Sequence, residues 1–270
     1  MKLKNSAVNF WSLAILAGLI FGAIFFGLIF NVLVNSGLNR QIAEQKEAAR
    51  PPKIAITLIQ DSSCQECVSL SPLVSAIKAA GAEVEAETAI EANDSAGQKL
   101  ISDYQITKIP TMVVKGELEK SSQLADLWKN LGEIADDVFV LRQVGAPYRE
   151  IGSGQIRGKV KITLLADQDC SNCYDVMGHL QILSRFGLPI KEQEVLDIDS
   201  SAGKKLVRDY KIELAPTFLL SGDLEVYSAL KSVWPQVGTV EPDGFYVFRA
   251  GVKTMGAYHD LETGQIITGS

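Results

Sequence analysis

The chain carries the stretch IAITLIQDSSCQEC at residues 54–67 and repeats it 106 residues later as VKITLLADQDCSNC at residues 160–173. The same shift aligns SAGQKLISDYQITKIPT, from Ser95, with SAGKKLVRDYKIELAPT, from Ser201. Between Ile54 and Phe139, roughly 26 of 86 positions are identical to their counterparts without a gap. Self-similarity at a fixed period indicates a repeated structural unit, so the sequence predicts two copies of one domain.

Strand-like and helix-like patterns alternate within each copy, which predicts the α/β fold class and a layered domain. The first copy is predicted to contain, in order, strand 54–59, helix 64–80, strand 84–89, helix 95–104, strand 111–114, a second short strand after a turn at Lys115-Gly116, and helix 124–131. The predicted order is therefore βαβαββα. The strand-like runs Val138–Arg142 and Phe245–Arg249 have no assigned place in it.

The N-terminal segment is apolar, with 35 uncharged residues between Lys4 and Arg40. A helix over residues 8–34 would be about 40 Å long, against a hydrocarbon layer of about 30 Å. The alternative, a cleaved signal peptide, has a shorter apolar core and a small-residue cleavage site, and neither is found here. We therefore expect a single transmembrane anchor in contact with membrane lipid.

Lysine and arginine counts on the two sides of this segment are nearly equal, so they do not orient it. A basic N-terminus, an apolar span and then the globular body is the layout of a signal anchor, which places the domains outside the cytoplasm. The predicted organisation is an anchor at 8–34, a connector at 35–52, domains at 53–145 and 158–250, and a C-terminal tail at 251–270.

Composition excludes several classes of protein. A net charge of −6 over 270 residues argues against a nucleic-acid-binding protein, which needs a basic surface. Four cysteines are too few for a disulfide-rich scaffold, and two histidines leave little for histidine-based catalysis. The sequence has neither a phosphate-binding loop nor a dinucleotide-binding glycine pattern, so no cofactor is expected beyond the cysteines themselves.

All four cysteines lie in two C-x-x-C pairs, Cys64 with Cys67 and Cys170 with Cys173. Each pair is predicted to follow a strand and open a helix, where the helix dipole would stabilise a thiolate at the first cysteine. The second cysteine would then resolve a mixed disulfide. Two pairs in the same position of a duplicated domain favour redox chemistry, with metal binding and structural disulfides as the alternatives.

Downstream of each pair stands a proline motif, Tyr-x-Ile-x-x-Ile-Pro-Thr from Tyr104 and Tyr-x-Ile-x-x-Ala-Pro-Thr from Tyr210. The first cysteine and the proline are 46 positions apart in both copies. With these motifs each copy resembles a thioredoxin-fold domain, and the tandem is similar to two-domain, glutaredoxin-like protein disulfide oxidoreductases. The resemblance covers nearly all of residues 54–250. It implies that Pro110 and Pro216 are cis and face the disulfides. It also implies that the neighbouring backbone holds the substrate chain, at Ile109, Thr111, Ala215 and Thr217.

The sequence departs from that family around the cysteines. Ser63 and Asp169 stand where a tryptophan usually precedes the first cysteine. The buried acid that serves as proton acceptor in thioredoxin has no evident counterpart in this sequence. Glu66 and Asp169 should oppose thiolate formation by like charge. Because they lie at different places around the two pairs, we expect the two sites to differ in redox potential by tens of millivolts.

The remaining polar and aromatic candidates are given structural roles. Asp61 and Asp167 lie three residues before the first cysteines, and two roles are considered for them: proton transfer, and the favoured role of capping a helix or a turn. His179 is expected at the surface or at its boundary with the core, and His259 has no predicted role. Trp128 and Trp234 occupy equivalent positions and are expected to pack in the core.

The sequence thus predicts a membrane-anchored thiol–disulfide oxidoreductase whose partners are protein thiols and disulfides. Cys64 and Cys170 would attack, and Cys67 and Cys173 would resolve. Electrons would be exchanged with a separate membrane redox partner, because the chain has no flavin or nicotinamide site of its own. Two alternatives stay open at this point: a module that binds or delivers Zn or Cu(I) through the cysteines, and a scaffold that holds an extended peptide.

Overall fold

The computed structural model describes residues 38–268 of the chain, which divides into two units, Met1–Pro51 and Pro52–Ser270. In the first unit residues 38–49 are helical, and the helix ends before the Pro51-Pro52 pair, as expected from the loss of backbone N–H groups at proline. The predicted anchor at 8–34 lies outside the described residues. Within residues 38–268, no helix combines the length and the apolar character needed to cross a membrane.

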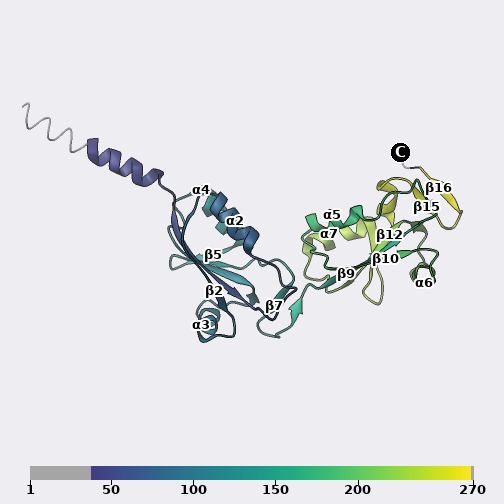
Figure 1. The fold of residues 1–270 in the computed structure, drawn as a ribbon, viewed down its shortest axis with the longest axis horizontal. Helices are drawn as coiled ribbons and strands as arrows, with labels where there is room; N and C mark the ends of the chain where they lie inside the picture. The colour runs from purple at the N-terminus through teal and green to yellow at the C-terminus, as the bar shows by residue number, and fades with distance from the viewer. Residues whose placement is uncertain (1–37, 269–270) are drawn as a thin grey trace, which may run out of the picture. The chain divides into compact units, whose positions relative to one another are not determined.

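The second unit contains both copies. The elements of the first copy are β1 (Lys53–Gln60), α2 (Ser71–Ala79), β2 (Glu83–Glu91), α3 (Ser95–Asp103), β3 (Lys108–Ile109), β4 (Thr111–Gly116), α4 (Ser122–Leu131), β5 (Gly132–Ala135), β6 (Val138–Leu141), β7 (Tyr148–Glu150) and β8 (Ile156–Arg157). Five of these strands form a mixed sheet, which Figure 1 shows between α2 and α4 on one side and α3 on the other. The order of its strands is β2-β1-β4-β6-β5. β1 and β2 are parallel, and the other neighbours are antiparallel.

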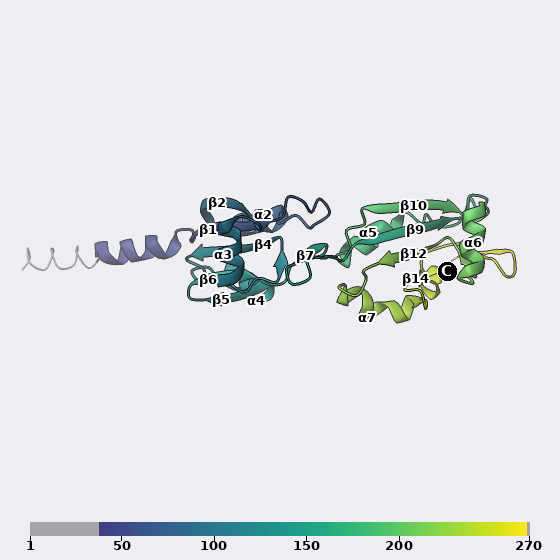
Figure 2. The same cartoon turned by 90° about the horizontal axis from the view of Figure 1, so that it is seen from below.

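The second copy repeats this arrangement. Its elements are β9 (Val160–Ala166), α5 (Gly178–Arg185), β10 (Glu192–Asp197), α6 (Ser201–Asp209), β11 (Leu214–Ala215), β12 (Thr217–Gly222), α7 (Ser228–Val237), β13 (Gly238–Val240), β14 (Tyr246–Phe248), the 3-10 helix η1 (Ala250–Thr254), β15 (Tyr258–Asp260) and β16 (Gln265–Ile267). Its five-stranded sheet has the order β10-β9-β12-β14-β13, in the same sequence of positions as the first (Figure 2).

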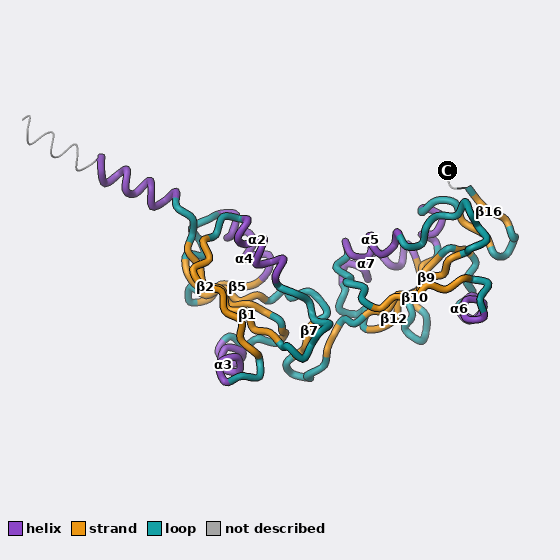
Figure 3. Tube along the Cα trace, in the orientation of Figure 1, coloured by secondary structure: helices purple, strands orange, loops and turns teal. Residues whose placement is uncertain are grey.

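Each sheet is covered on both faces. In the first copy α2 and α4 pack on one face through Ile77 and Trp128, and α3 packs on the other through Ile101 (Figure 3). The second copy has α5 and α7 on one face and α6 on the other. The alternating burial of β1, in which Ile54 and Ile56 face one side, follows from the two-residue period of a strand. The predicted class is confirmed as a mixed α/β fold with two five-stranded sheets.

The order of elements differs from the predicted βαβαββα. The predicted second strand after Lys115-Gly116 is a turn, and α4 follows it directly, before the hairpin β5–β6. Ser121 caps α4 by accepting a hydrogen bond from the Leu124 N–H, and Trp128 Nε1 donates to the Leu118 carbonyl at 3.0 Å. These bonds commit the residues after Gly116 to capping the helix, so they cannot extend the sheet.

The strand-like runs without an assigned place complete the two sheets. Val138–Leu141, as β6, pairs with β4, and Tyr246–Phe248, as β14, pairs with β12. All four residues of β6 are buried because the strand lies between β4 and β5 and is covered on both faces.

Two small sheets stand beside the large ones, in the orders β3-β7-β8 and β11-β15-β16. Two strands of each small sheet come from residues 148–157 or 258–267, which were predicted to lie between the domains and in the tail. The third strand of each small sheet, β3 or β11, lies within a proline motif and ends at the residue before the proline. Each small sheet therefore brings a distant segment of the chain to the candidate site.

Candidate active site

Both C-x-x-C pairs are disulfides in loops of the same geometry. The Cα atoms of Cys64 and Cys67, and those of Cys170 and Cys173, are 5.4 Å apart. In the first loop the Cys64 N–H donates to the Asp61 carbonyl at 3.0 Å and the Cys67 N–H to the Cys64 carbonyl at 3.3 Å. The corresponding bonds in the second loop are 3.3 Å and 3.2 Å. The two loops are thus folded by the same backbone bonds.

The cysteines do not open helices, contrary to the prediction. α2 begins at Ser71 and α5 at Gly178, each several residues past the second cysteine. Pro72 stands in the first turn of α2, where proline fits best, and it disfavours helix before Ser71. The residue after each pair is also bound elsewhere: Val68 N–H donates to the Pro147 carbonyl and Tyr174 N–H to the Ala257 carbonyl. The argument for a thiolate stabilised by a helix dipole therefore does not apply.

The exposure of the cysteines does not match their predicted roles, because the cysteine predicted to attack is the more buried one in each pair. Cys64 and Cys170 are each 7% exposed, whereas Cys67 and Cys173 are only half-buried. Attack by the first cysteine of each pair stays a prediction.

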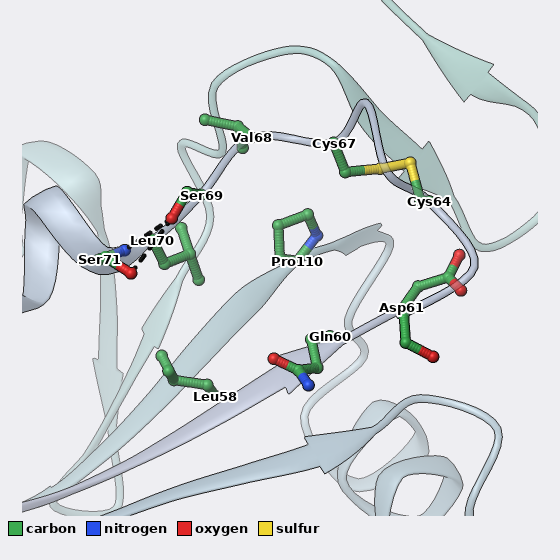
Figure 4. A pocket seen from close by; sticks show the side chains of 11 residues that line it. Leu58, Gln60, Asp61, Cys64, Cys67, Val68, Ser69, Leu70, Ser71 and Pro110 are labelled. Atoms are coloured by element: carbon green, nitrogen blue, oxygen red, sulfur yellow. Dashed lines mark hydrogen bonds between the residues drawn. A yellow bond between two sulfur atoms is a disulfide. The ribbon is translucent and has the colours of Figure 1, made fainter.

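Both motif prolines follow cis peptide bonds, which confirms that prediction, and a third cis bond joins Ala146 to Pro147. Pro110 lines one pocket together with Cys64 and Cys67, and Figure 4 shows its ring beneath the disulfide loop. The rest of the pocket wall is formed by Leu58, Gln60, Asp61, Ser62, Val68, Ser69, Leu70 and Ser71. The first disulfide therefore forms part of the wall of an open pocket.

The other predicted substrate-binding residues are engaged within the protein. Thr111 and Thr217 are fully buried, and their hydroxyls donate to the Leu141 carbonyl at 2.8 Å and the Phe248 carbonyl at 2.5 Å. Ile109 pairs with Arg149 of β7.

The second copy has the same pairing, Ala215 with His259 of β15. Backbone bonds from Ile151 to Thr107 and from Leu261 to Glu213 fix the registers of the two ladders. Hydrogen-bonded and non-hydrogen-bonded pairs alternate along an antiparallel ladder, so Ile109 and Ala215 both fall at hydrogen-bonded positions. Their backbone N–H and C=O groups are therefore bonded to β7 and β15.

The side chain of Asp61 is bound by Arg149, which lies on β7 opposite Ile109. Arg149 Nε donates to Asp61 Oδ2, and Ser63 Oγ donates to Asp61 Oδ1 at 2.5 Å. Burial raises the pKa of Asp61, but the hydrogen bonds from Ser63 and Arg149 and the guanidinium charge outweigh it, so this pKa lies below its ordinary value. The carboxylate beside the first disulfide is therefore ionised and paired with a permanent cation.

Asp167 has a different partner in the same position. His259 Nδ1 lies 2.6 Å from Asp167 Oδ2, and the Asp169 N–H donates to Asp167 Oδ1 at 3.2 Å. A carboxylate oxygen of Asp167 and the sulfurs of Cys170 and Cys173 all lie within 4.8 Å of one another. The Asp167 side chain is 3% exposed and that of His259 is 26% exposed. The buried carboxyl group of Asp167 thus lies next to the second disulfide, and it contacts the partly exposed imidazole of His259.

Sequence reasoning missed both Arg149 and His259. The shift of 106 aligns Arg149 with Met255, whereas the structural equivalent His259 is 110 positions away. A four-residue gap would have shown it, because YREIGSGQI from Tyr148 then aligns with YHDLETGQI from Tyr258. Both segments are hairpins with a glycine at the same turn position, Gly154 with φ 68° and Gly264 with φ 69°.

His179 is fully buried, not at the surface or its boundary with the core as predicted. It is 2% exposed, its ring lies 4.5 Å from that of Phe218, and burial lowers the pKa of the imidazole to about 4. Its Nε2 is 3.2 Å from the Tyr174 hydroxyl, which donates to the Pro216 carbonyl at 2.6 Å. This neutral histidine is therefore part of the packing under the second proline motif.

Glu66 is less able to oppose a thiolate than its position suggested, because Lys159 forms an ion pair with it. Both side chains are at least 40% exposed, so the pairing is weak in free-energy terms. The charge of Lys159 still offsets that of Glu66 at the first site. Among the described residues, no ion pair is found for Asp169 at the second site.

Comparison with known proteins adds little to this description. No protein-family model matches the chain, and no curated protein matches it. Among solved structures, two of alkylhydroperoxide reductase AhpF from Enterococcus faecalis are similar: its NTD_N/C domain and its C503A mutant. Each is 19% identical, with 69% of this chain and 90% of the other covered and a TM-score of 0.19. A TM-score this low supports no conclusion about activity, so the functional argument rests on the site itself.

Proposed function

We propose that this chain is a membrane-anchored thiol–disulfide oxidoreductase that exchanges disulfides with protein substrates through Cys64–Cys67 and Cys170–Cys173. The observation that carries the proposal is the repetition of the site. In both copies a C-x-x-C disulfide lies in the same loop after the first strand, with a proline motif 46 residues beyond its first cysteine. The two loops also share their backbone bonds.

The exchange reaction needs no group beyond the cysteines. A substrate thiolate attacks one sulfur of the protein disulfide, the S–S bond breaks, and a mixed disulfide forms. The second substrate thiol then attacks the mixed disulfide, so the substrate leaves oxidised and the protein holds two thiols. Two electrons pass from substrate to protein, and the two protons lost by the substrate dithiol balance the two taken up by the protein. The reverse sequence reduces a substrate disulfide.

β7 and β15 restrict how a substrate can be bound, because they pair with the strands before the two prolines. Since β7 and β15 occupy the backbone of Ile109 and Ala215, a substrate chain at the first site enters through the pocket lined by Leu58, Val68 and Leu70. Leu58 and Leu70 offer apolar contact next to the disulfide, and Pro110 forms the floor. This favours an unfolded or loop segment of a protein as the substrate.

The Zn or Cu(I) alternative requires free thiolates. In the described state each sulfur is bonded to its partner, so ligation would have to follow reduction. The exchange assay tests the first function: the oxidised full chain is mixed with a peptide dithiol, and exchange at both sites yields two peptide disulfides per chain, counted by mass-shift alkylation. Metal analysis of the chain purified under reducing conditions tests the alternative, because stoichiometric metal would favour Zn or Cu(I) binding.

We further propose that residues 8–34 anchor the chain in the membrane with its domains outside the cytoplasm, where a separate membrane protein exchanges electrons with them. The support is the uncharged segment between Lys4 and Arg40. Protease added to intact cells should then digest the chain beyond about residue 50, because the domains are exposed to the medium. A cytoplasmic control protein must stay intact. Full protection of the domains, with digestion only after lysis, would reverse the proposed orientation.

A further inference from the structure

Two lysines of the second copy contact the cysteine loop of the first copy. Both copies belong to the unit Pro52–Ser270. Lys191, just before β10, donates from Nζ to the carbonyls of Gln65 and Glu66 at 3.3 Å and 3.1 Å. Lys159, just before β9, forms an ion pair with the Glu66 carboxylate. The two residues between the cysteines of the first site are therefore bound by cations that come from the other copy.

The first copy has a different pair at the equivalent positions. The shift of 106 aligns Lys159 with Lys53 and Lys191 with Glu85. Lys53 and Glu85 form an ion pair with each other, with 2.8 Å between Nζ and Oε1. Because position 191 is a lysine, the second copy cannot form this pair, and it has two like charges there instead. Both ammonium groups bind the loop of the first copy, where the Glu66 side chain and two carbonyls accept them.

The cysteine loop of the second copy has no such cations. Its two central residues, Ser171 and Asn172, are uncharged. Within residues 38–268, no lysine is bonded to either of them. The two sites therefore differ in the positive charge next to the disulfide as well as in their carboxylates, and the difference arises from residues that lie outside the first copy.

We propose that Lys159 and Lys191 are positioning residues of the first site, through which the second copy makes the Cys64–Cys67 disulfide a stronger oxidant. The proposal rests on the exchange chemistry proposed above. When a substrate dithiol reduces this disulfide, the S–S bond breaks, the substrate leaves as a disulfide, and two electrons stay on the cysteine sulfurs. Ammonium groups at the loop stabilise a sulfur in its thiolate form more than they stabilise the uncharged disulfide. A disulfide whose reduced form is stabilised is the more oxidising one.

The two lysines act at short range on an exposed loop. The Glu66 carbonyl is part of the peptide bond to Cys67, so the Lys191 ammonium lies next to the backbone of the second cysteine. Lys159 offsets the Glu66 charge, which would otherwise oppose a thiolate by repulsion. The side chains of Lys159 and Glu66 are 48% and 40% exposed, so water and salt weaken the interaction. The expected effect is therefore modest, of the size measured for exposed charge pairs.

Other charged groups also face the first loop. Asp61 is paired with Arg149, and Glu91 accepts a hydrogen bond from the Ser62 N–H at 2.9 Å. These groups lie in or next to the first copy's own sheet and are not bonded to either lysine. They stay in place in the variants below, so they do not account for a difference between those variants.

The test measures the redox equilibrium of the first site in the full chain with Cys170→Ser and Cys173→Ser, in dithiothreitol buffers at pH 7 and pH 9. We expect Lys159→Gln with Lys191→Gln to lower the equilibrium constant for reduction of the disulfide about threefold to tenfold at pH 9, or about 14 to 30 mV. The shift should be smaller at pH 7, because free thiols ionise near pH 8.5 and an uncharged thiol gains little from a cation.

Three controls separate charge from packing. Lys161→Gln removes an exposed lysine of β9 that pairs with Glu194 at 2.8 Å and does not contact the loop, so it should leave the equilibrium unchanged. Lys159→Arg with Lys191→Arg keeps both positive charges and should stay close to the parent chain. The second site, measured in the chain with both first-site cysteines replaced by serine, should not respond to the glutamine substitutions.

A shift that is larger at pH 9 than at pH 7, and that the arginine variants lack, supports the proposal. An unchanged equilibrium in the double glutamine variant overturns it, as does an equal shift at both pH values, which would indicate altered packing. If circular dichroism shows that the double variant does not fold, Lys191→Gln alone decides by the same criteria. If the first site of the parent chain does not react with dithiothreitol at either pH, the proposed function fails instead, before any lysine is replaced.

Discussion

Replacing all four cysteines by serine should abolish disulfide exchange with a peptide dithiol. The loss should be complete, because the described residues contain no other free or paired thiol and serine cannot form a mixed disulfide. Replacing only Cys64 and Cys67, or only Cys170 and Cys173, should leave one peptide disulfide formed per chain. The readout is the number of peptide disulfides formed, measured by mass-shift alkylation.

The two single-site variants serve as controls for each other, since each carries the same kind of substitution in the same loop. The loops are exposed at Ser62, Ser63 and Gln65, and the disulfides are not part of the buried core clusters. Loss of exchange is therefore not expected to come from unfolding, which circular dichroism would reveal. A four-serine chain that still oxidised the peptide would place the chemistry outside the cysteines.

Trp128→Ala should cost about 3–5 kcal/mol in the free energy of unfolding of the first copy, the range for removing a large buried aromatic side chain. Trp128 is fully buried, its ring lies 4.5 Å from that of Phe139, and its Nε1 donates to the Leu118 carbonyl at 3.0 Å. The substitution leaves a cavity between α4 and the sheet and also leaves that carbonyl without its donor. Guanidinium unfolding of the oxidised chain, followed by circular dichroism, measures the change.

Ile134→Ala is the matched control, because Ile134 lies on the neighbouring strand β5 and is 39% exposed. We expect it to cost less than about 1 kcal/mol. Equal losses for the two variants would show that Trp128 does not hold α4 on the sheet. Its counterpart Trp234 is 2% exposed and should behave as Trp128 does in the second copy.

The duplicated domain and its core could be predicted because their signals are local. The two-residue alternation of Ile54 and Ile56 and the paired tryptophans depend only on nearby residues, and the structure buries all of them. The cis bonds before Pro110 and Pro216 were predicted from the resemblance to thioredoxin-fold domains, which a motif of similarly short span carries. Each of these features recurs at the same shift of 106 residues, so an alignment of the two copies without gaps reveals it.

The partners of the cysteine loops could not be found in this way, because they are distant along the chain. Arg149 is 88 positions from Asp61, and His259 is 92 positions from Asp167. Each lies on a strand of three residues, too short for its apolar pattern to show. The short strand predicted after Lys115-Gly116 failed for a related reason: those residues lead into the Ser121 cap of α4, and the distant strand β6 pairs with β4 instead.

The most direct test of the central claim is a redox titration of the full chain in dithiothreitol and glutathione buffers, with alkylation and mass measurement at each point. Redox-active sites predict two transitions of two electrons each, one per cysteine pair, at midpoints separated by about tens of millivolts because the charges around the pairs differ. The reduced chain should carry no stoichiometric metal. Pairs that stay oxidised in every buffer, or a reduced chain that retains zinc or copper at each pair, would contradict the account.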